Sequence, residues 1–149
     1  MNALGGSGGR LFMNLREKES LAYTVTPILS YSQAGGIIGA YMATSSDKLS
    51  RAMDLLKSEF LALKEKPLGA LEIERAKNFL IGQHEASMQR SDSQAMSMAL
   101  MCAYGIGYDD FMTYSSKISA VSEEDCVRII DKYFNISKWN EVVVGKVEN

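Results

Sequence analysis

The sequence is poor in the residues that build metal sites and disulfide frameworks. Its 149 residues include one histidine, two cysteines and two prolines. Because His84 is the only imidazole, this chain alone cannot form a zinc site from two or three histidines. Cys102 and Cys126 lie far apart and form no C-x-x-C pair. We therefore expect no disulfide framework and predict that both are small buried residues in a reducing compartment.

Strong charge and long apolar runs are also missing. The chain has 16 Lys and Arg against 18 Asp and Glu, which gives a net charge of −2 and does not favour a nucleic-acid partner. The longest apolar stretches are short, as in residues 35–42, so no segment is long enough to cross a membrane. The first residues have neither the basic region nor the apolar core of a signal peptide. We expect a cytoplasmic protein.

What is present is the pattern of an α+β domain. Apolar periodicity predicts a helix over 10–19, and alternation predicts strands over 21–32 and 37–44, with a turn at Gly35–Gly36 and a bulge or an edge position at Pro27. A third strand is expected over 139–147. Four helical segments are expected in between. The first covers 45–66, and the second is a long segment from Leu71 that bends or splits at Gly82 or at 89–94. The third covers 109–118, and the fourth is capped by Ser122 and Asp125.

The grouping of strands and helices predicts an antiparallel sheet with helices packed on one face. Hydrophobic residues make up 46% and charged residues 23%, and the length suits a single domain over 1–149. Three strands are few for so many helices. We therefore expect at least one strand to lie outside this chain, which would then be a fragment truncated at its N-terminus.

Histidine and methionine give weak functional signals. His84 and Glu85 are adjacent, as in H-E-x-x-H, but no second histidine follows, so we interpret His84 as a polar helix residue. The methionines gather in one region, at Met88, Met96, Met98 and Met101. Methionine can line adaptable surfaces, but core packing against the sheet is the interpretation that we prefer.

A glycine-rich segment precedes the first expected helix. Gly5, Gly6, Gly8 and Gly9 form a loop of the kind that can hold phosphate on free N–H groups. No Gly-Lys-Ser/Thr follows it and no G-x-G-x-x-G occurs, so phosphate binding is the weakest of the functional alternatives. A loop that contacts something else, or a structural turn, is preferred.

Arg16 and Tyr23 lie on the two sides of a short connection from the first helix to the first strand. Their side chains can therefore converge on one point. Arg offers a charged fork of donors and Tyr an O–H, which suit a carbonyl or a developing oxyanion. The residues alone equally allow a helix-capping Arg and an ordinary strand Tyr.

Several segments together resemble the M16 metallopeptidases, the group of pitrilysin, insulin-degrading enzyme and the mitochondrial processing peptidases. The most specific match combines LGGSGGRLF and LREKESLAY, residues 4–12 and 15–23, and it is similar to the signature of the non-zinc half of these proteins. Weaker matches follow at GGIIGAY, LEIERAK and VSEEDC, residues 35–41, 71–77 and 121–126. The resemblance covers essentially the whole chain.

The resemblance implies a two-layer α+β half that closes on a second half around a peptide. In the family, the other half binds zinc through H-x-x-E-H, and this half contributes an Arg and a Tyr near the scissile carbonyl, which correspond here to Arg16 and Tyr23. Gly5, Gly6, Gly8 and Gly9 correspond to a longer substrate loop of one non-catalytic subunit. The implied partners are the N-terminal catalytic half and a peptide. Independently of the resemblance, a missing edge strand would leave unpaired backbone, so we predict a homodimer formed by strand addition.

The chain departs from the family because it contains no H-x-x-E-H. We therefore expect no metal bound here, zinc only in the other half of a parent enzyme, and no peptide hydrolysis by this chain alone. Two alternatives stay open: a substrate-binding domain of an endopeptidase, and a non-catalytic scaffold or assembly module of the same fold.

Overall fold

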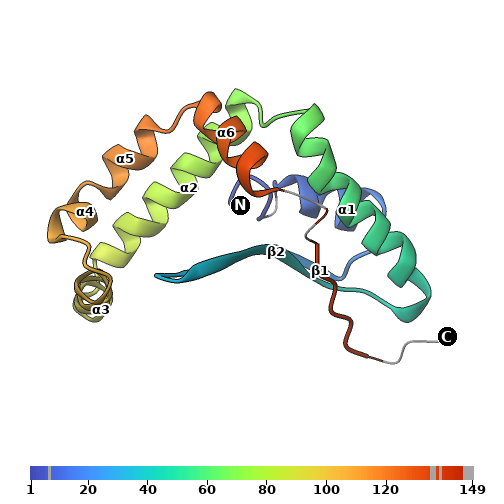
Figure 1. Ribbon diagram of the computed structural model, residues 1–149, viewed down its shortest axis with the longest axis horizontal. Helices are drawn as coiled ribbons and strands as arrows, with labels where there is room; N and C mark the ends of the chain where they lie inside the picture. Colours follow the sequence, from blue (N-terminus) through green and yellow to red (C-terminus); the bar gives the residue numbers. More distant parts are fainter. Residues whose placement is uncertain (7, 135–136, 138, 146–149) are drawn as a thin grey trace.

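The computed structural model describes residues 1–6, 8–134, 137 and 139–145. The hairpin of β1 (Thr24–Ser32) and β2 (Gly35–Ala43) forms one layer and the helices lie on one side of it, which confirms the predicted α+β class (Figure 1). In chain order the elements are η1 (Phe12–Lys18), β1 (Thr24–Ser32), β2 (Gly35–Ala43), η2 (Ser46–Lys48), α1 (Leu49–Glu65), α2 (Ala70–Met88), α3 (Ser91–Ala103), α4 (Tyr108–Met112), α5 (Tyr114–Ala120) and α6 (Glu123–Tyr133).

The hairpin pairs residue for residue. Pro27 lies opposite Ala40 with no extra residue, so the structure has the predicted edge position but no bulge. The turn is formed by residues 33–34, so the prediction of a turn at Gly35–Gly36 is wrong. Both glycines belong to β2. A Cβ on Gly36 would lie 2.7 Å from the carbonyl oxygen of Ser30, so glycine there permits a close approach of the two strands.

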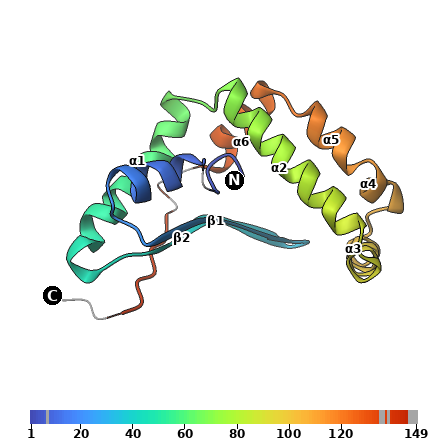
Figure 2. The same cartoon turned by 180° about the vertical axis from the view of Figure 1, so that it is seen from behind.

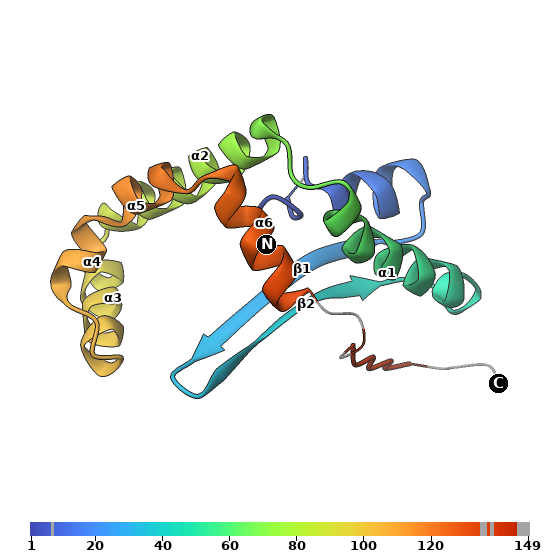
Figure 3. The same ribbon diagram turned by 45° about the horizontal axis from the view of Figure 1, so that its top comes forward.

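The third predicted strand is not formed in the part of the chain that the structure describes. Residues 139–145 make no ladder with the sheet, and residues 146–147 of the prediction lie outside the described residues. Figure 3 shows this segment near the end of the hairpin that lies by α1. A groove of about 680 Å³, lined by residues 40–46 and 139–145 among others, lies between β2 and this segment. The two segments line one groove and form no ladder.

The core forms where α1 and η1 cover the base of the hairpin. The apolar stripe of α1 supplies Leu56, Phe60 and Leu63, as its spacing predicts. Phe60 also stacks on the ring of Phe134, at a centroid distance of 5.6 Å, and contacts the ring of Trp139 edge to face at 5.2 Å. The other buried members of the cluster are Leu4, Leu11, Leu15, Ala22, Val25 and Ile130. The corner between η1 and β1 therefore lies directly on the buried core, to which residues on both of its sides contribute.

The helices α2 to α5 form an arm that extends away from this core (Figure 1). The predicted long helix splits at residues 89–90 into α2 and α3, while Gly82 lies inside α2. The predicted helix over 109–118 is two helices, α4 and α5, which meet at Thr113. No helix of the described residues is long and apolar enough to span a membrane.

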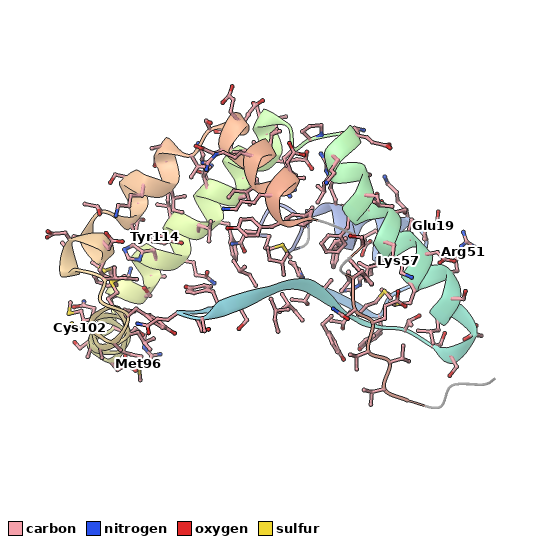
Figure 4. The ribbon with its side chains drawn as sticks, viewed as in Figure 1. Glu19, Arg51, Lys57, Met96, Cys102 and Tyr114 are labelled. Atoms are coloured by element: carbon pink, nitrogen blue, oxygen red, sulfur yellow. The ribbon has the colours of Figure 1, made fainter. Side chains whose placement is uncertain are left out.

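The methionine-rich helix α3 lies at the far end of the arm, and none of its described residues is buried. Met96 is 63% exposed, and Cys102 is exposed as well, so the predictions of core methionines and of a buried Cys102 are wrong here. Figure 4 shows both residues on this end helix. The reason is position, because the helix reaches the hairpin only at its tip, where the Gln33 side-chain amide donates to the carbonyl oxygen of Ala103 (3.3 Å).

Candidate functional site

The corner between η1 and β1 carries both residues that the sequence singles out. The carbonyl oxygen of Leu15 accepts hydrogen bonds from the N–H groups of Leu21 (2.8 Å) and Ala22 (3.2 Å), which folds the chain back on itself. Ser20 sits at the apex with φ 50°, the left-handed conformation that a sharp reversal requires. Figure 2 shows η1 against α1, next to the start of β1.

Arg16 and Tyr23 both lie at the surface of this corner. The guanidinium of Arg16 rests over the ring of Phe12, 4.9 Å from its centroid, and its Nε lies 3.8 Å from Oε1 of Glu17. Tyr23 is 82% exposed, while its backbone N–H donates to the carbonyl oxygen of Ala43 (2.8 Å). Within the described residues no hydrogen bond joins the two side chains, and apart from the contact of Arg16 with Glu17 neither side chain has a polar partner.

η1 is a π-helix, a rare conformation that the sequence pattern did not predict. At its C-terminal end, the N–H of Glu19 donates to the carbonyl oxygen five residues earlier, that of Asn14 (3.3 Å). Single π-helical turns occur frequently at functional sites. Apolar periodicity cannot distinguish such a segment from an α-helix over so few residues, so no sequence signal was available.

Three side chains from the junction between β2 and α1 hold the corner. Thr44 Oγ1 donates to the carbonyl oxygen of Leu21 (2.6 Å), and Lys48 Nζ donates to that of Ser20 (3.1 Å). Arg51 pairs with Glu19, as Figure 4 shows. On the opposite side, the Asn14 side-chain amide donates to Glu59 Oε1 of α1 (2.7 Å).

The described glycines of the loop differ in their packing, because Gly6 and Gly8 are exposed and Gly9 is buried. Arg75 of α2 donates to the carbonyl oxygens of Gly8 and, at 3.1 Å, Ala3. A Cβ on Gly9 would lie 2.3 Å from the carbonyl oxygens of Leu4 and Gly5, so only glycine fits there. The loop carbonyls that could meet a ligand are therefore partly engaged within the domain. A role of Gly5, Gly6, Gly8 and Gly9 in substrate binding stays a prediction.

An ion pair ties the start of the first helical segment to α2. Arg10 donates from Nε and Nη2 to the two carboxylate oxygens of Glu72, at 2.6 and 2.7 Å. It also donates to the carbonyl oxygens of Lys66 (2.7 Å) and Pro67 (2.8 Å). The hydrogen bond from Arg10 holds the pKa of the Glu72 carboxyl below its usual value, and the same bond raises the pKa of Arg10.

His84 takes part in an aromatic cluster on the arm. Its ring centroid lies 5.0 Å from that of Phe111 and 4.6 Å from that of Tyr114. Burial raises the pKa of the Tyr114 phenol, and nearby Tyr31 of the hairpin adds to the shift. Among the described residues, no three His, Cys, Asp or Glu side chains come together as a metal site would require.

The chain is similar in sequence to proteins of one known family. Residues 1–80, which contain the corner and the glycine-rich loop, match the family described as Peptidase M16 inactive domain. An uncharacterized zinc protease of Rickettsia felis is 30% identical over 146 residues, which are 95% of this chain and 34% of that protein. A Helicobacter pylori protein named "Non-peptidase homolog YmxG" is 31% identical over 141 residues, 95% of this chain and 33% of that protein.

The fold has a close counterpart among solved structures. The peptidase M16 inactive domain from Pseudomonas fluorescens superposes with a TM-score of 0.80 at 21% identity, covering 92% of this chain and 35% of that one. The chain spans about a third of the length of these two curated relatives. Because the family match covers more than half of its residues, the chain belongs to the family of the peptidase M16 inactive domain.

Proposed function

We propose that the chain is the substrate-binding and closure domain of a zinc-dependent endopeptidase, in which Arg16 and Tyr23 contact the peptide near the scissile bond. The observation that carries the proposal is the pair of side chains on one fixed corner. Both are exposed, and within the described residues Glu17 is the one polar partner of the Arg16 side chain, while the Tyr23 hydroxyl has none. The family match and the zinc-protease name of the Rickettsia relative support the choice of reaction.

The chemistry follows from the two side-chain types. A guanidinium offers charged N–H donors and a phenol offers one O–H donor. Donors fixed before the reaction, near the point where negative charge develops on the carbonyl oxygen, lower the barrier of peptide hydrolysis. Zinc would be bound by the N-terminal half of the parent protein. Arg16 and Tyr23 would then supply hydrogen bonds and positive charge from the opposite side of the peptide.

The test uses the full-length parent protein. Replacing Tyr23 by Phe, or Arg16 by Ala, is expected to lower kcat for peptide cleavage by about 10²–10³ each, the usual cost of one such donor. Tyr41→Phe is the matched control, because Tyr41 is a second exposed tyrosine, on β2. Near-normal kcat in both Tyr23→Phe and Arg16→Ala would remove the proposed role.

A second candidate is a non-catalytic scaffold or assembly module. The Helicobacter relative favours it, because that protein is named a non-peptidase homolog. The two candidates differ in the rest of the parent sequence, where an H-x-x-E-H motif supports the peptidase and its absence supports the scaffold. If the scaffold is right, the parent will cleave no peptide, and Tyr23→Phe will leave its assembly unchanged.

The remaining assignments belong to the same proposal. Residues 1–149 would act as one domain that lacks the first strand of the half. Its partners would be the N-terminal half, a peptide and, through the unpaired edge of the hairpin, a second copy of the chain. We also propose a cytoplasmic location.

A further inference from the structure

We infer that Thr44, Lys48 and Arg51, at the junction between β2 and α1, are positioning residues that set where Tyr23 lies relative to Arg16. This inference rests on the proposed function, since it concerns how the two peptide contacts are held. None of the three needs to touch the peptide. Each acts through the backbone or a side chain of residues 19–21, the apex of the corner.

The three contacts reach three consecutive residues. Arg51 pairs with Glu19, Lys48 Nζ donates to the carbonyl oxygen of Ser20, and Thr44 Oγ1 donates to that of Leu21. Lys48 and Arg51 are exposed, where such contacts contribute little because water screens them. Thr44 is half-buried and its hydrogen bond is 2.6 Å long, so it is the contact that matters most.

The connection from Thr44 to Tyr23 is short. The carbonyl oxygen of Leu21 accepts a hydrogen bond from Thr44 Oγ1, and the N–H of Tyr23 donates one to the carbonyl oxygen of Ala43. Residues 21 and 23 are therefore both hydrogen-bonded to the end of β2. Arg16 is held from a different side, because its helix is tied to α1 by the bond between Asn14 and Glu59. We therefore expect a change at Thr44 to displace residues 21–23 more than Arg16, whose carbonyl oxygen also accepts from the N–H of Ser20 (3.1 Å).

Ser20 gives a second reason why the apex must be held. It is a non-glycine residue at φ 50°. This conformation costs on the order of 1 kcal/mol and persists only where neighbouring contacts enforce it. Without the donors of Thr44 and Lys48, the apex can relax toward an extended conformation and change the direction in which β1 begins.

The first experiment compares Thr44→Val with Thr44→Ser in the full-length parent. Valine keeps the shape and removes the donor, whereas serine keeps the donor. We expect Thr44→Val to lower kcat for peptide cleavage about tenfold with little change in KM, since misplacement by ~1 Å can cost on the order of 10²-fold. Thr44→Ser should keep kcat close to that of the wild type. Lys48→Met, at an exposed position, should lower kcat about twofold to threefold. It replaces Thr44→Val as the test variant if Thr44→Val does not fold.

A double-mutant cycle distinguishes positioning from general support. If Thr44 acts through Tyr23, Thr44→Val will have no further effect in the Tyr23→Phe background. Losses that simply multiply would mean that Thr44 supports the fold in general, and the inference would be wrong. Thr26→Val, at an exposed threonine of β1, is the control and should leave kcat unchanged.

Hydrogen exchange gives a readout that does not depend on turnover. In the parent, the amides of residues 21–23 should exchange faster in Thr44→Val than in Thr44→Ser, with the same midpoint of global unfolding. Equal exchange in the two variants overturns the inference. If Arg16→Ala and Tyr23→Phe lose activity but Thr44→Val does not, the inference alone fails. If Arg16→Ala and Tyr23→Phe keep normal kcat, both the proposed function and the inference that rests on it are wrong.

Discussion

At the scale of single residues, the glycine-rich loop shows how charged side chains decide what a flexible sequence does. Glycines before a helix are compatible with an open anion-binding loop. Here Arg75 donates to the carbonyl oxygen of Gly8, and Arg10 donates to both carboxylate oxygens of Glu72 and to two backbone carbonyls. The partners of these arginines lie more than fifty residues away in the sequence. In the described residues, these contacts tie Ala3, Gly8 and Arg10, on both sides of residue 7, to α2 and to the turn before it.

The ion pair between Arg10 and Glu72 predicts a pH-dependent stability. Its hydrogen bond lowers the pKa of Glu72, so the carboxylate stabilises the fold above its unfolded value of about 4.3, and this contribution is lost as the pH falls through the lower folded value. Glu72→Gln should therefore cost about 1 kcal/mol of unfolding free energy near pH 7, and less below about pH 4.

Urea denaturation at the two pH values measures this difference. Glu74→Gln is the matched control, because Glu74 is exposed on the same turn of α2 and should lose little at either pH. A loss in Glu72→Gln that is the same at both pH values would show that the packing of the side chain, and not its charge, stabilises the fold.

At the scale of elements, segments with strong local signals could be predicted from the sequence. The stripe of α1 buries Leu56, Phe60 and Leu63 as expected. The capping box of α6 forms as predicted, with the Asp125 N–H donating to Ser122 Oγ and the Ser122 N–H donating to Asp125 Oδ2, both at 3.1 Å. Both signals lie within a few turns of chain, so they need no knowledge of the tertiary structure.

Features that depend on distant partners could not be predicted. The bond from Thr44 to Leu21 relies on residues that come together only in the fold. The π-helical form of η1 is local, but the apolar pattern cannot distinguish it from an α-helix. The strand expected over 139–147 had the right β-branched residues, but in its described part it lacks a neighbouring strand to pair with. For the site, the sequence resemblance singled out Arg16 and Tyr23, whereas the residues that hold them carried no signal.

α2 allows a prediction about helix stability. Gly82 lies in the middle of this helix, exposed, and a Cβ there would have no atom within 4 Å. Gly82→Ala should raise the unfolding free energy by about 1 kcal/mol, because alanine loses less backbone entropy. Thermal denaturation measures it. Gly9→Ala, where a Cβ would meet backbone oxygens at 2.3 Å, should do the opposite. Destabilisation by Gly82→Ala would mean that another segment packs against that face.

At the scale of the whole molecule, the exposed surfaces do not resemble those of a self-contained domain. In the described residues the sheet has two strands, so both edges carry unpaired backbone groups. Helix α3 buries none of its described residues. The chain spans about a third of the length of its two curated relatives. These surfaces are where we expect the rest of a longer protein, or another copy, to pack.

The free edge of β2 predicts that the isolated chain associates with itself by strand addition. Light scattering should detect dimers or larger species. Tyr41 is 56% exposed and lines the groove beside β2, so Tyr41→Lys should shift the distribution toward monomer by placing charge at this edge. Leu71→Lys removes a more exposed apolar side chain, 82% exposed, from α2 and is the control. If Leu71→Lys disperses the chain equally well, association follows from general hydrophobic exposure. A monodisperse wild-type monomer would show that neither surface drives association, and the proposed contact between copies would then fail.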